Sequence, residues 1–317
     1  MICKHCGGVC KRHGFDPYSQ QRWRCLTCLK TSIERRRRPL NQMRLSAEKA
    51  ISCLHLLVEG MSVRGIERVT GVGKRTILAL LLLAGRKCGR LQDRRIQQVK
   101  VTDVQADEIW GFVWCKQKTK NRKGYGDDTG DAYCFVAIER NTKLILAWHL
   151  GHRTTEDTEA FTEKLERATS GRFQLTTDGW ESYPDAVSLS LGVRVDYAQI
   201  IKTYRAAHPT QNPEGERRYS PSRVLEVIKV PRIGGPSDAA ICTSHVERQN
   251  LTIRMQMRRL TRLTNGFSKK WENLHAAFAL HFAYYNFCRI HKTLRCTPAM
   301  EAGITKRLWE LKDLLTS

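Results

Sequence analysis

The chain has 317 residues, of which 54 are Lys or Arg and 31 are Asp or Glu, so its formal charge is +23 and its pI is near 9.8. This length predicts two or three folded units rather than one. With 41% hydrophobic and 27% charged residues, the composition is that of a chain that folds. The longest apolar run, Ile77 to Ala84, has eight residues, whereas a bilayer span needs roughly 20, so we exclude membrane residence.

The positive charge is concentrated in the first third of the chain. Residues 1–100 carry 22 Lys or Arg against 6 Asp or Glu, a net charge of +16, and the rest of the chain carries +7. Such a field favours nucleic acid, because each neutralised phosphate releases counterions. A merely solvated basic surface is the alternative. The N-terminal residues lack the apolar region of a secretory signal, so we expect a cytoplasmic, nucleoid-associated protein with reduced cysteines.

Residues 1–38 are predicted to form a zinc ribbon. Two CxxC pairs, 18 residues apart, have the spacing of a tetrahedral structural Zn²⁺ site. So short a segment lacks an adequate core, and the metal would supply its folding free energy. A redox role for the pairs would require a surrounding βαβ pattern that is absent here. The proposed ligands are Cys3, Cys6, Cys25 and Cys28, and the residues near enough to replace one are His5, Cys10 and His13.

An arginine run follows the ribbon. Arg35 to Arg38 carry four like charges that cannot pack together, which predicts an extended linker. We expect Arg36 and Arg37 to contact DNA phosphates, and a solvated linker without a partner is the alternative.

Residues 39–100 are predicted to form a helix-turn-helix DNA-binding domain. After a first helix that begins near Ser46 and stops at Gly60, residues 62–70 form a short second helix. A turn over residues 71–73 leads into a third helix that ends near Gly85. This recognition helix would place Lys74, Arg75 and Thr76 against the DNA groove. A three-helix core without a DNA role is the alternative.

Residues 101–317 are predicted to form an α/β catalytic domain with C-terminal helices, so that the whole chain is a multidomain α+β protein. Residues rich in Ile, Val, Phe and Trp predict three strands, then a helix and a fourth strand. This order is the opening of an RNase H-like fold. The expected strands are Ala106–Cys115, Ala132–Glu139, Lys143–His149 and Gln174–Asp178, the helix is Thr154–Thr169, and a long hairpin loop covers Lys116–Asp131.

Three acidic residues are candidates for a catalytic metal site. Asp107 lies in the first strand, Asp178 ends the fourth, and Glu247 lies on a helix that is expected to run from Thr243 or Ser244 to about Arg262. Acids from different elements can converge on two divalent ions that activate the attacking oxygen and stabilise the leaving oxygen.

Glu108 and Arg254 lie close to these acids in the sequence. Glu108 points to the opposite face of the strand from Asp107, so we favour Asp107, and a contribution from Glu108 stays open. Arg254 shares the helix face of Glu247, about two turns further on. Other arginines near this helix add a basic surface suited to a DNA backbone.

Five motifs in this order resemble the DDE transposases of bacterial insertion sequences, and most closely the insertion-sequence-one family. The resemblance covers essentially the whole chain. The motifs are the CxxC pairs, the helix-turn-helix at Gly60-Met61-Ser62, Asp107-Glu108-Ile109-Trp110, Asp178-Gly179-Trp180 and Glu247-Arg248-Gln249-Asn250. Residues 263–270, and a tail at residues 284–292 with Thr297-Pro298, are also similar to family segments.

The resemblance implies a transposase with an RNase H-like core. Asp107, Asp178 and Glu247 would hold two Mg²⁺ or Mn²⁺ ions, and Arg254 would contact DNA. The enzyme would cut double-stranded DNA at the terminal inverted repeats of an element and join the freed 3′-hydroxyl to target DNA. A homodimer or larger assembly is expected, because two ends must be joined. Residues 206–237, which are rich in Pro, Gly and Arg, are expected to be an insertion that forms a flexible DNA-facing loop, and disorder is the alternative.

Other functions remain as alternatives. A catalytically inactive DNA-binding regulator derived from a transposase would keep the first 100 residues but could lose an acid. Covalent recombination through Tyr284 or Tyr285 is disfavoured, because both lie in an apolar helical stretch. His149 and His152 have the wrong spacing for a single-strand nuclease. The remaining residues expected to be structural are Cys53, Cys134, Cys288, His275, His281 and His291.

Overall fold

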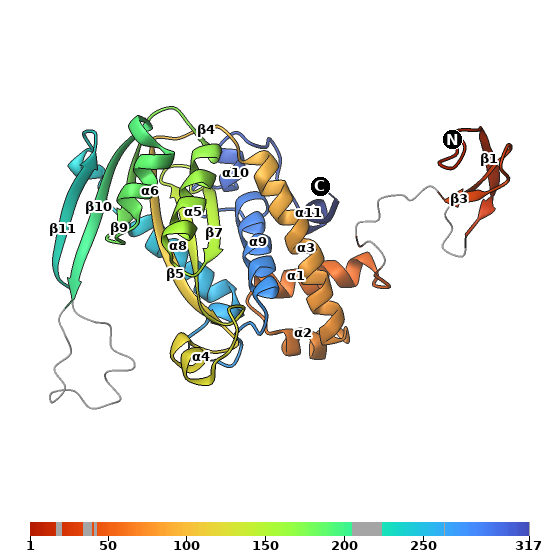
Figure 1. The fold of residues 1–317 in the computed structure, drawn as a ribbon, viewed down its shortest axis with the longest axis horizontal. Coiled ribbons are helices and arrows are strands. Elements are labelled where there is room, and N and C mark those ends of the chain that lie inside the picture. Colours follow the sequence, from red (N-terminus) through yellow and green to blue (C-terminus); the bar gives the residue numbers. More distant parts are fainter. Residues whose placement is uncertain (17–20, 34–39, 41–42, 205–223, 263, 317) are drawn as a thin grey trace. The chain divides into compact units, whose positions relative to one another are not determined.

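The structure, a computed structural model, describes residues 1–16, 21–33, 40, 43–204, 224–262 and 264–316 (Figure 1). The chain divides into two compact units, Met1–Ala47 and Glu48–Ser317. The expected contacts of Arg36 and Arg37 lie outside the described residues.

The first unit is a small antiparallel sheet in the order β1-β2-β3. Its strands are β1 (Cys10–Phe15), β2 (Gln21–Cys25) and β3 (Thr31–Ile33). The register pairs Cys10 with Cys25 and Trp23 with Ser32. Cys3, Cys10 and Cys25 are buried against Trp23, and this small cluster is the core of the unit.

The second unit opens with three helices, α1 (Ala47–Val58), α2 (Val63–Thr70) and α3 (Lys74–Arg95). Ser62 caps α2 by accepting a hydrogen bond from the backbone N–H of Gly65, and Gly71 ends it in the left-handed conformation with φ of 68°. The carboxylate of Glu67 then accepts the backbone N–H of Lys74 and fixes the turn between α2 and α3.

The expected end of the third helix near Gly85 is wrong. Helix α3 continues to Arg95, and Gly85 lies where α3 crosses α9 (Trp271–Phe287). A Cβ atom at position 85 would approach Ala276 to 2.6 Å, so glycine is required here by the close contact of two helices rather than by a helix end. Helices α1–α3 belong to the same compact unit as the large sheet, so the expected boundary at residue 100 does not separate compact units.

A six-stranded mixed sheet forms the centre of this unit, in the order β11-β10-β9-β5-β6-β7. Strand β5 is antiparallel to β6 and parallel to β9, and β9 is parallel to β10. The strands are β5 (Asp103–Val113), β6 (Gly130–Glu139), β7 (Ile145–Gly151), β9 (Phe173–Asp178), β10 (Val195–Tyr204) and β11 (Val224–Ile233). The four expected strands are confirmed within three residues at each end. Short strands β4 (Val99–Lys100) and β8 (Thr169–Ser170) pair separately.

Helices pack on the sheet in layers (Figure 1). Helix α5 (Thr155–Ala168) packs on β6 and β7 and against α6 (Tyr183–Ser190), while α8 (Ser244–Gln256) packs on β5 and β6, and α9 on β7. The main core joins alternate residues of β5 and β6 to α8 and α9. The remaining helical segments are α4 (Gln117–Lys123), α10 (Pro298–Glu301), α11 (Leu311–Thr316), η1 (Gly192–Arg194), η2 (Asp238–Ala240) and η3 (Arg258–Leu260).

Three expected boundaries differ from the structure. The loop expected at Lys116–Asp131 contains α4, whose C-cap is Gly124. The loop expected at residues 206–237 includes β11, which pairs antiparallel with β10 because its Val and Ile residues extend the sheet edge. Helix α8 ends at Gln256, well before Arg262, because Met257 is extended.

None of the helices in the described residues is both long and apolar enough to span a membrane.

Candidate metal centres and their surroundings

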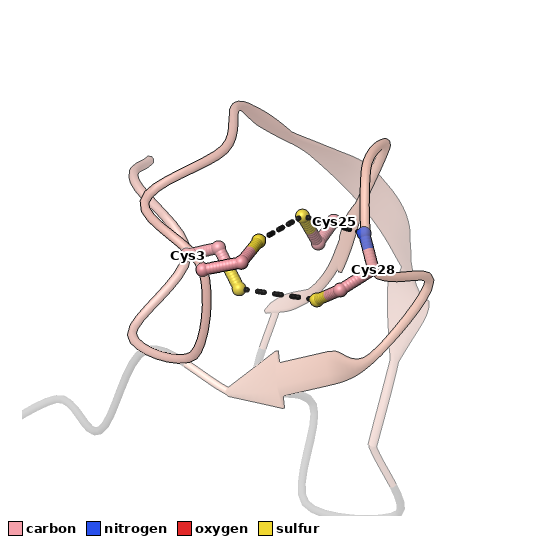
Figure 2. Close-up of side chains that lie close together, drawn as sticks. Cys3, Cys25 and Cys28 are labelled. Atoms are coloured by element: carbon pink, nitrogen blue, oxygen red, sulfur yellow. Dashed lines mark hydrogen bonds between the residues drawn. The ribbon is translucent and has the colours of Figure 1, made fainter.

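Four cysteine sulfurs converge in the first unit (Figure 2). Cys3 Sγ lies 3.6 Å from Cys28 Sγ, and Cys6 Sγ lies 3.4 Å from Cys25 Sγ. Four thiolates bound tetrahedrally at about 2.3 Å would be separated by about 3.8 Å, so this four-cysteine cluster is compatible with a zinc site. The backbone N–H of Cys28, then that of Thr27, donates to Cys25 and lowers the pKa of this thiol to about 6. Cys10, His5 and His13 are not members of the cluster.

The second candidate centre lies where β5 and β9 separate. The parallel ladder between them ends at the pair Ala106 and Thr177, and the next residues are Asp107 and Asp178. Both line a cleft of about 590 Å³, to which Glu247 on α8 also contributes. The structure therefore brings the three acids expected from the sequence around one cleft.

Asp107 is held on the α8 side of the sheet. The side-chain N–H of Asn250 donates to its Oδ2 over 2.9 Å, and the backbone N–H of Glu108 donates to its Oδ1 over 2.8 Å. Burial, together with the nearby charges of Asp178 and Glu247, raises the pKa of Asp107 to about 7. A bound cation next to this carboxyl would favour its charged form and lower its pKa again.

Glu108, whose contribution the sequence left open, belongs to this acidic group. Oxygens of Asp107, Glu108 and Asp178 lie within 4.8 Å of one another, so these three could hold a metal ion. Glu108 does lie on the other face of β5, where Tyr183 donates to it. Its longer side chain nevertheless reaches Asp178, because β9 has ended and leaves this edge of β5 open. Burial, then the charge of Asp178, raises the pKa of Glu108 to about 8.

Arg153 is a site residue that the sequence did not indicate. Its Nη2 lies 3.0 Å from Glu108 Oε2 and 3.4 Å from Asp178 Oδ2. The guanidinium also lies over the ring of Trp180, 4.4 Å from its centroid. Arg153 directly precedes the cap of α5 and has a positive φ of 64°, so a local turn aims it back into the cleft. The only sequence signal for it is its position just after a strand end.

Glu247 lies at the more open side of the cleft. Its Oε1 is paired with Lys202 of β10 and accepts the Thr243 hydroxyl over 2.8 Å. Its carboxylate is not among the three that cluster most closely, and its side chain is 47% exposed. Lys202 also lines the cleft, so two cations, Lys202 and Arg153, accompany the acids there.

The remaining predicted site residues lie elsewhere. Arg254 donates to the backbone carbonyls of Trp110 and Leu260 over 3.2 Å each and lines a neighbouring pocket rather than the acidic cleft. Arg254 thus joins α8 to β5 and does not line the acidic cleft, and its expected contact with DNA stays a prediction. At the start of α3, Lys74 and Arg75 are exposed and Thr76 is half-buried.

No model of a known protein family matches the sequence, and no curated protein matches it. Among solved structures, the chain is similar to a piggyBac transposase synaptic complex with hairpin DNA, at 10% identity and a TM-score of 0.37, over 86% of this chain and 70% of that one. It is also similar to endonuclease V from Bacillus subtilis, at 13% identity and a TM-score of 0.23, over 65% of this chain and 90% of that one. At these scores neither likeness carries an argument about the activity of this chain.

Proposed function

We propose that this protein is a DNA transposase of the DDE type that cuts element ends and joins the 3′-hydroxyl to target DNA. The observation that carries the proposal is the placement of Asp107, Asp178 and Glu247, from two strands and a helix, around one cleft that also holds two cations. The five sequence motifs that resemble the insertion-sequence-one family support the same activity.

An RNase H-like core is part of this proposal. Three antiparallel strands, β5 to β7, are followed by a helix and by two strands that add in parallel on the other side of β5. The acids stand at the carboxyl end of β9, where neighbouring strands diverge and side chains from both can meet. This is the place in an α/β sheet where ligands are bound most often.

The acids would hold two Mg²⁺ or Mn²⁺ ions, which when bound activate the attacking oxygen and stabilise the leaving oxygen. The carboxylates of Asp107 and Asp178 are suited to this, since burial raises the pKa of both and a cation would relieve their repulsion. Glu108, which lies on the other face of β5 from Asp107, is a further candidate ligand near Asp178.

The chain's own residues would position the DNA. Arg153 and Lys202 supply positive charge at the cleft, where a phosphate must enter against several carboxylates. Asn250 orients Asp107 through its hydrogen bond of 2.9 Å. In each step a water or 3′-hydroxyl oxygen attacks phosphorus as the opposite P–O bond breaks, and no protein nucleophile is required.

The first 100 residues would find the DNA. A zinc ribbon built on the four-cysteine cluster and a helix-turn-helix built from α2 and α3 are proposed as double-stranded DNA contacts. In the second of these, the exposed Lys74 and Arg75 begin the recognition helix, with Thr76 beside them. A dimer or larger assembly would hold two element ends together.

The test uses labelled duplexes taken from the DNA that flanks the coding sequence, incubated with Mg²⁺ or Mn²⁺. We expect cleavage by the wild type and by the control Asp185→Asn, an exposed acid on α6, and loss of cleavage in Asp178→Ala and Glu247→Gln. Equal cleavage by all four proteins would exclude the proposed metal site. Binding without cleavage by the wild type would favour the alternative, an inactive DNA-binding regulator.

A further inference from the structure

A second pocket lies beside β5, past the end of β9, and differs in chemistry from the acidic cleft. Its volume is about 400 Å³, within the range of small-molecule sites. Its walls contain three aromatic rings, Trp110, Phe112 and Phe267, all of them half-buried. Phe112 bridges the other two, with ring centroids 5.8 Å from Trp110 and 4.9 Å from Phe267. The pocket therefore offers flat apolar surfaces in a concave setting.

Every charged residue that lines this pocket in the described part of the chain is a cation. Lys116 Nζ lies 5.6 Å from the ring centroid of Trp110. The other cations are Arg254, Arg259 and Arg262. Four positive charges with no acid in the lining favour an anionic ligand, and the aromatic walls favour a planar one.

Arg259 gives an independent indication of a missing partner. Arg259 is half-buried, its burial lowers its pKa to about 10, and its Nε has no hydrogen-bond partner among the described residues. A buried N–H of a cation without a partner is costly, and an anion in this pocket, one of two that Arg259 lines, would offset part of that cost. Arg254, by contrast, is tied to the carbonyls of Trp110 and Leu260 and keeps the walls in place.

The position of the pocket relates it to the acids. Trp110 follows Asp107 by three residues on the same strand, a backbone separation of about 10 Å, and alternation places it on the strand face of Glu108. The pocket is therefore within reach of a DNA strand, a few nucleotides from a phosphate that lies at the acids. Bases inside a duplex are stacked on one another and cannot enter a concave pocket, whereas an unpaired base can.

We propose that this pocket binds an unpaired nucleotide of single-stranded DNA, with the base against Trp110 and the phosphate facing the cations. The proposal rests on the proposed function only for the identity of the nucleic acid. Helix α4, which begins next to Lys116, extends the basic surface with Lys118, Arg122 and Lys123, whereas Lys120 is paired with Asp127.

The test measures binding of a fluorescein-labelled single strand of mixed sequence without added Mg²⁺ or Mn²⁺, so that cleavage plays no part and the zinc of the four-cysteine cluster is retained. We expect Trp110→Leu to weaken binding about 5-fold to 100-fold, Trp110→Phe to restore most of it, and binding of the matching duplex to change little. The matched control is Trp114→Leu, because Trp114 is 46% exposed and lies outside the pocket lining.

A base analogue locates the effect. 2-Aminopurine placed in a single-stranded overhang should lose emission on binding to the wild type and to Trp110→Phe, but not to Trp110→Leu. If Trp110→Leu does not fold, the single-strand affinity of Phe267→Leu provides a second test of the pocket. Equal single-strand affinity in Trp110→Leu, Phe267→Leu and Trp114→Leu would overturn the pocket proposal even if DNA cleavage is observed. If the variants show the expected differences in single-strand binding but the wild type cleaves no duplex with Mg²⁺ or Mn²⁺, the pocket proposal stands and the transposase proposal fails.

Discussion

Arg153 Nη2 lies 3.0 Å from Glu108 Oε2, which places a cation in direct contact with the acidic group. The same nitrogen lies 3.4 Å from Asp178 Oδ2, so Arg153 connects the two faces of the site. Glu108 is nearly buried, with 3% of its side chain exposed, so this contact is shielded from solvent more than a surface ion pair.

Arg153→Ala should lower DNA cleavage about 10-fold or more, because a positive group that can contact phosphate is removed. The same substitution should tighten Mn²⁺ binding to the free protein, since the carboxylates of Glu108 and Asp178 lose a competing cation. Cleavage rates and calorimetric Mn²⁺ titration measure the two effects. Arg194→Ala is the control, because Arg194 pairs with Glu166 away from the cleft. Unchanged cleavage and unchanged Mn²⁺ affinity would contradict the assigned role.

The acidic cleft should make the metal-free protein less stable at high pH. The pKa of Asp107 is raised to about 7 and that of Glu108 to about 8, mainly by burial, whereas unfolded carboxyls titrate near 4. Between these values the folded state binds more protons than the unfolded state, so the free energy of unfolding falls as pH rises.

We therefore expect a lower Tm of the second unit at pH 8.5 than at pH 6 without added Mg²⁺ or Mn²⁺, and a smaller difference in Glu108→Gln. Each 1 kcal/mol corresponds to about 2–4 °C in a domain of this size class. Asp185→Asn, an exposed acid on α6, should show the wild-type difference. A Tm that rises with pH over this interval would refute the prediction.

Disruption of the four-cysteine cluster should unfold the first unit alone. Cys25→Ser removes a thiolate from the cluster, and a small sheet without its metal lacks a sufficient core. Zinc content should fall from one ion per chain to nearly none, while the thermal transition of Glu48–Ser317 persists because it is a separate compact unit. Cys10→Ser should retain zinc, since Cys10 lies outside the cluster. Zinc loss in both variants would mean that Cys10 is also a ligand.

Substitution at the start of α3 should weaken DNA binding through charge. Lys74 and Arg75 are exposed there, and removing either cation from a DNA phosphate should reduce the slope of log affinity against log salt by about 1. The double variant Lys74→Ala/Arg75→Ala is compared with Arg94→Ala, an exposed arginine near the other end of α3. Equal salt slopes in the two proteins would show that the start of α3 does not contact DNA.

Two glycines of α3 should respond oppositely to alanine. Gly85→Ala should destabilise the second unit by about 1–3 kcal/mol, because the new Cβ would lie 2.6 Å from Ala276 of α9. Gly89→Ala should stabilise it by about 0.5–1 kcal/mol, since a Cβ there meets nothing within 4 Å and alanine favours the helix. Chemical denaturation measures both, and similar effects of the two substitutions would show that α3 does not approach α9 as described.

The local sequence was sufficient to predict four strands of the large sheet, the four cysteines of the cluster and the three acids of the cleft. The Ile, Val, Phe and Trp content of β5, β6, β7 and β9 predicted these strands within three residues, because strands that are buried on both faces appear in the sequence as short apolar runs. The CxxC spacing predicted the sulfur cluster, since each pair spans a single turn. Asp107, Asp178 and Glu247 were recognisable from their motifs, and the structure brings them to one cleft.

Only the tertiary structure decided what depends on contacts between distant segments. Gly85 reads as a helix end in isolation, and only the crossing of α9 shows why α3 continues past it. The strand period places Glu108 away from Asp107, and only the early end of β9 allows both to approach Asp178. Arg153 has no motif of its own, because its role arises from a turn that aims it at acids 25 and 45 residues away in the chain. The residue pattern of one helix or strand shows on which face each side chain lies. A site also depends on where the neighbouring strands and helices end, which the pattern does not show.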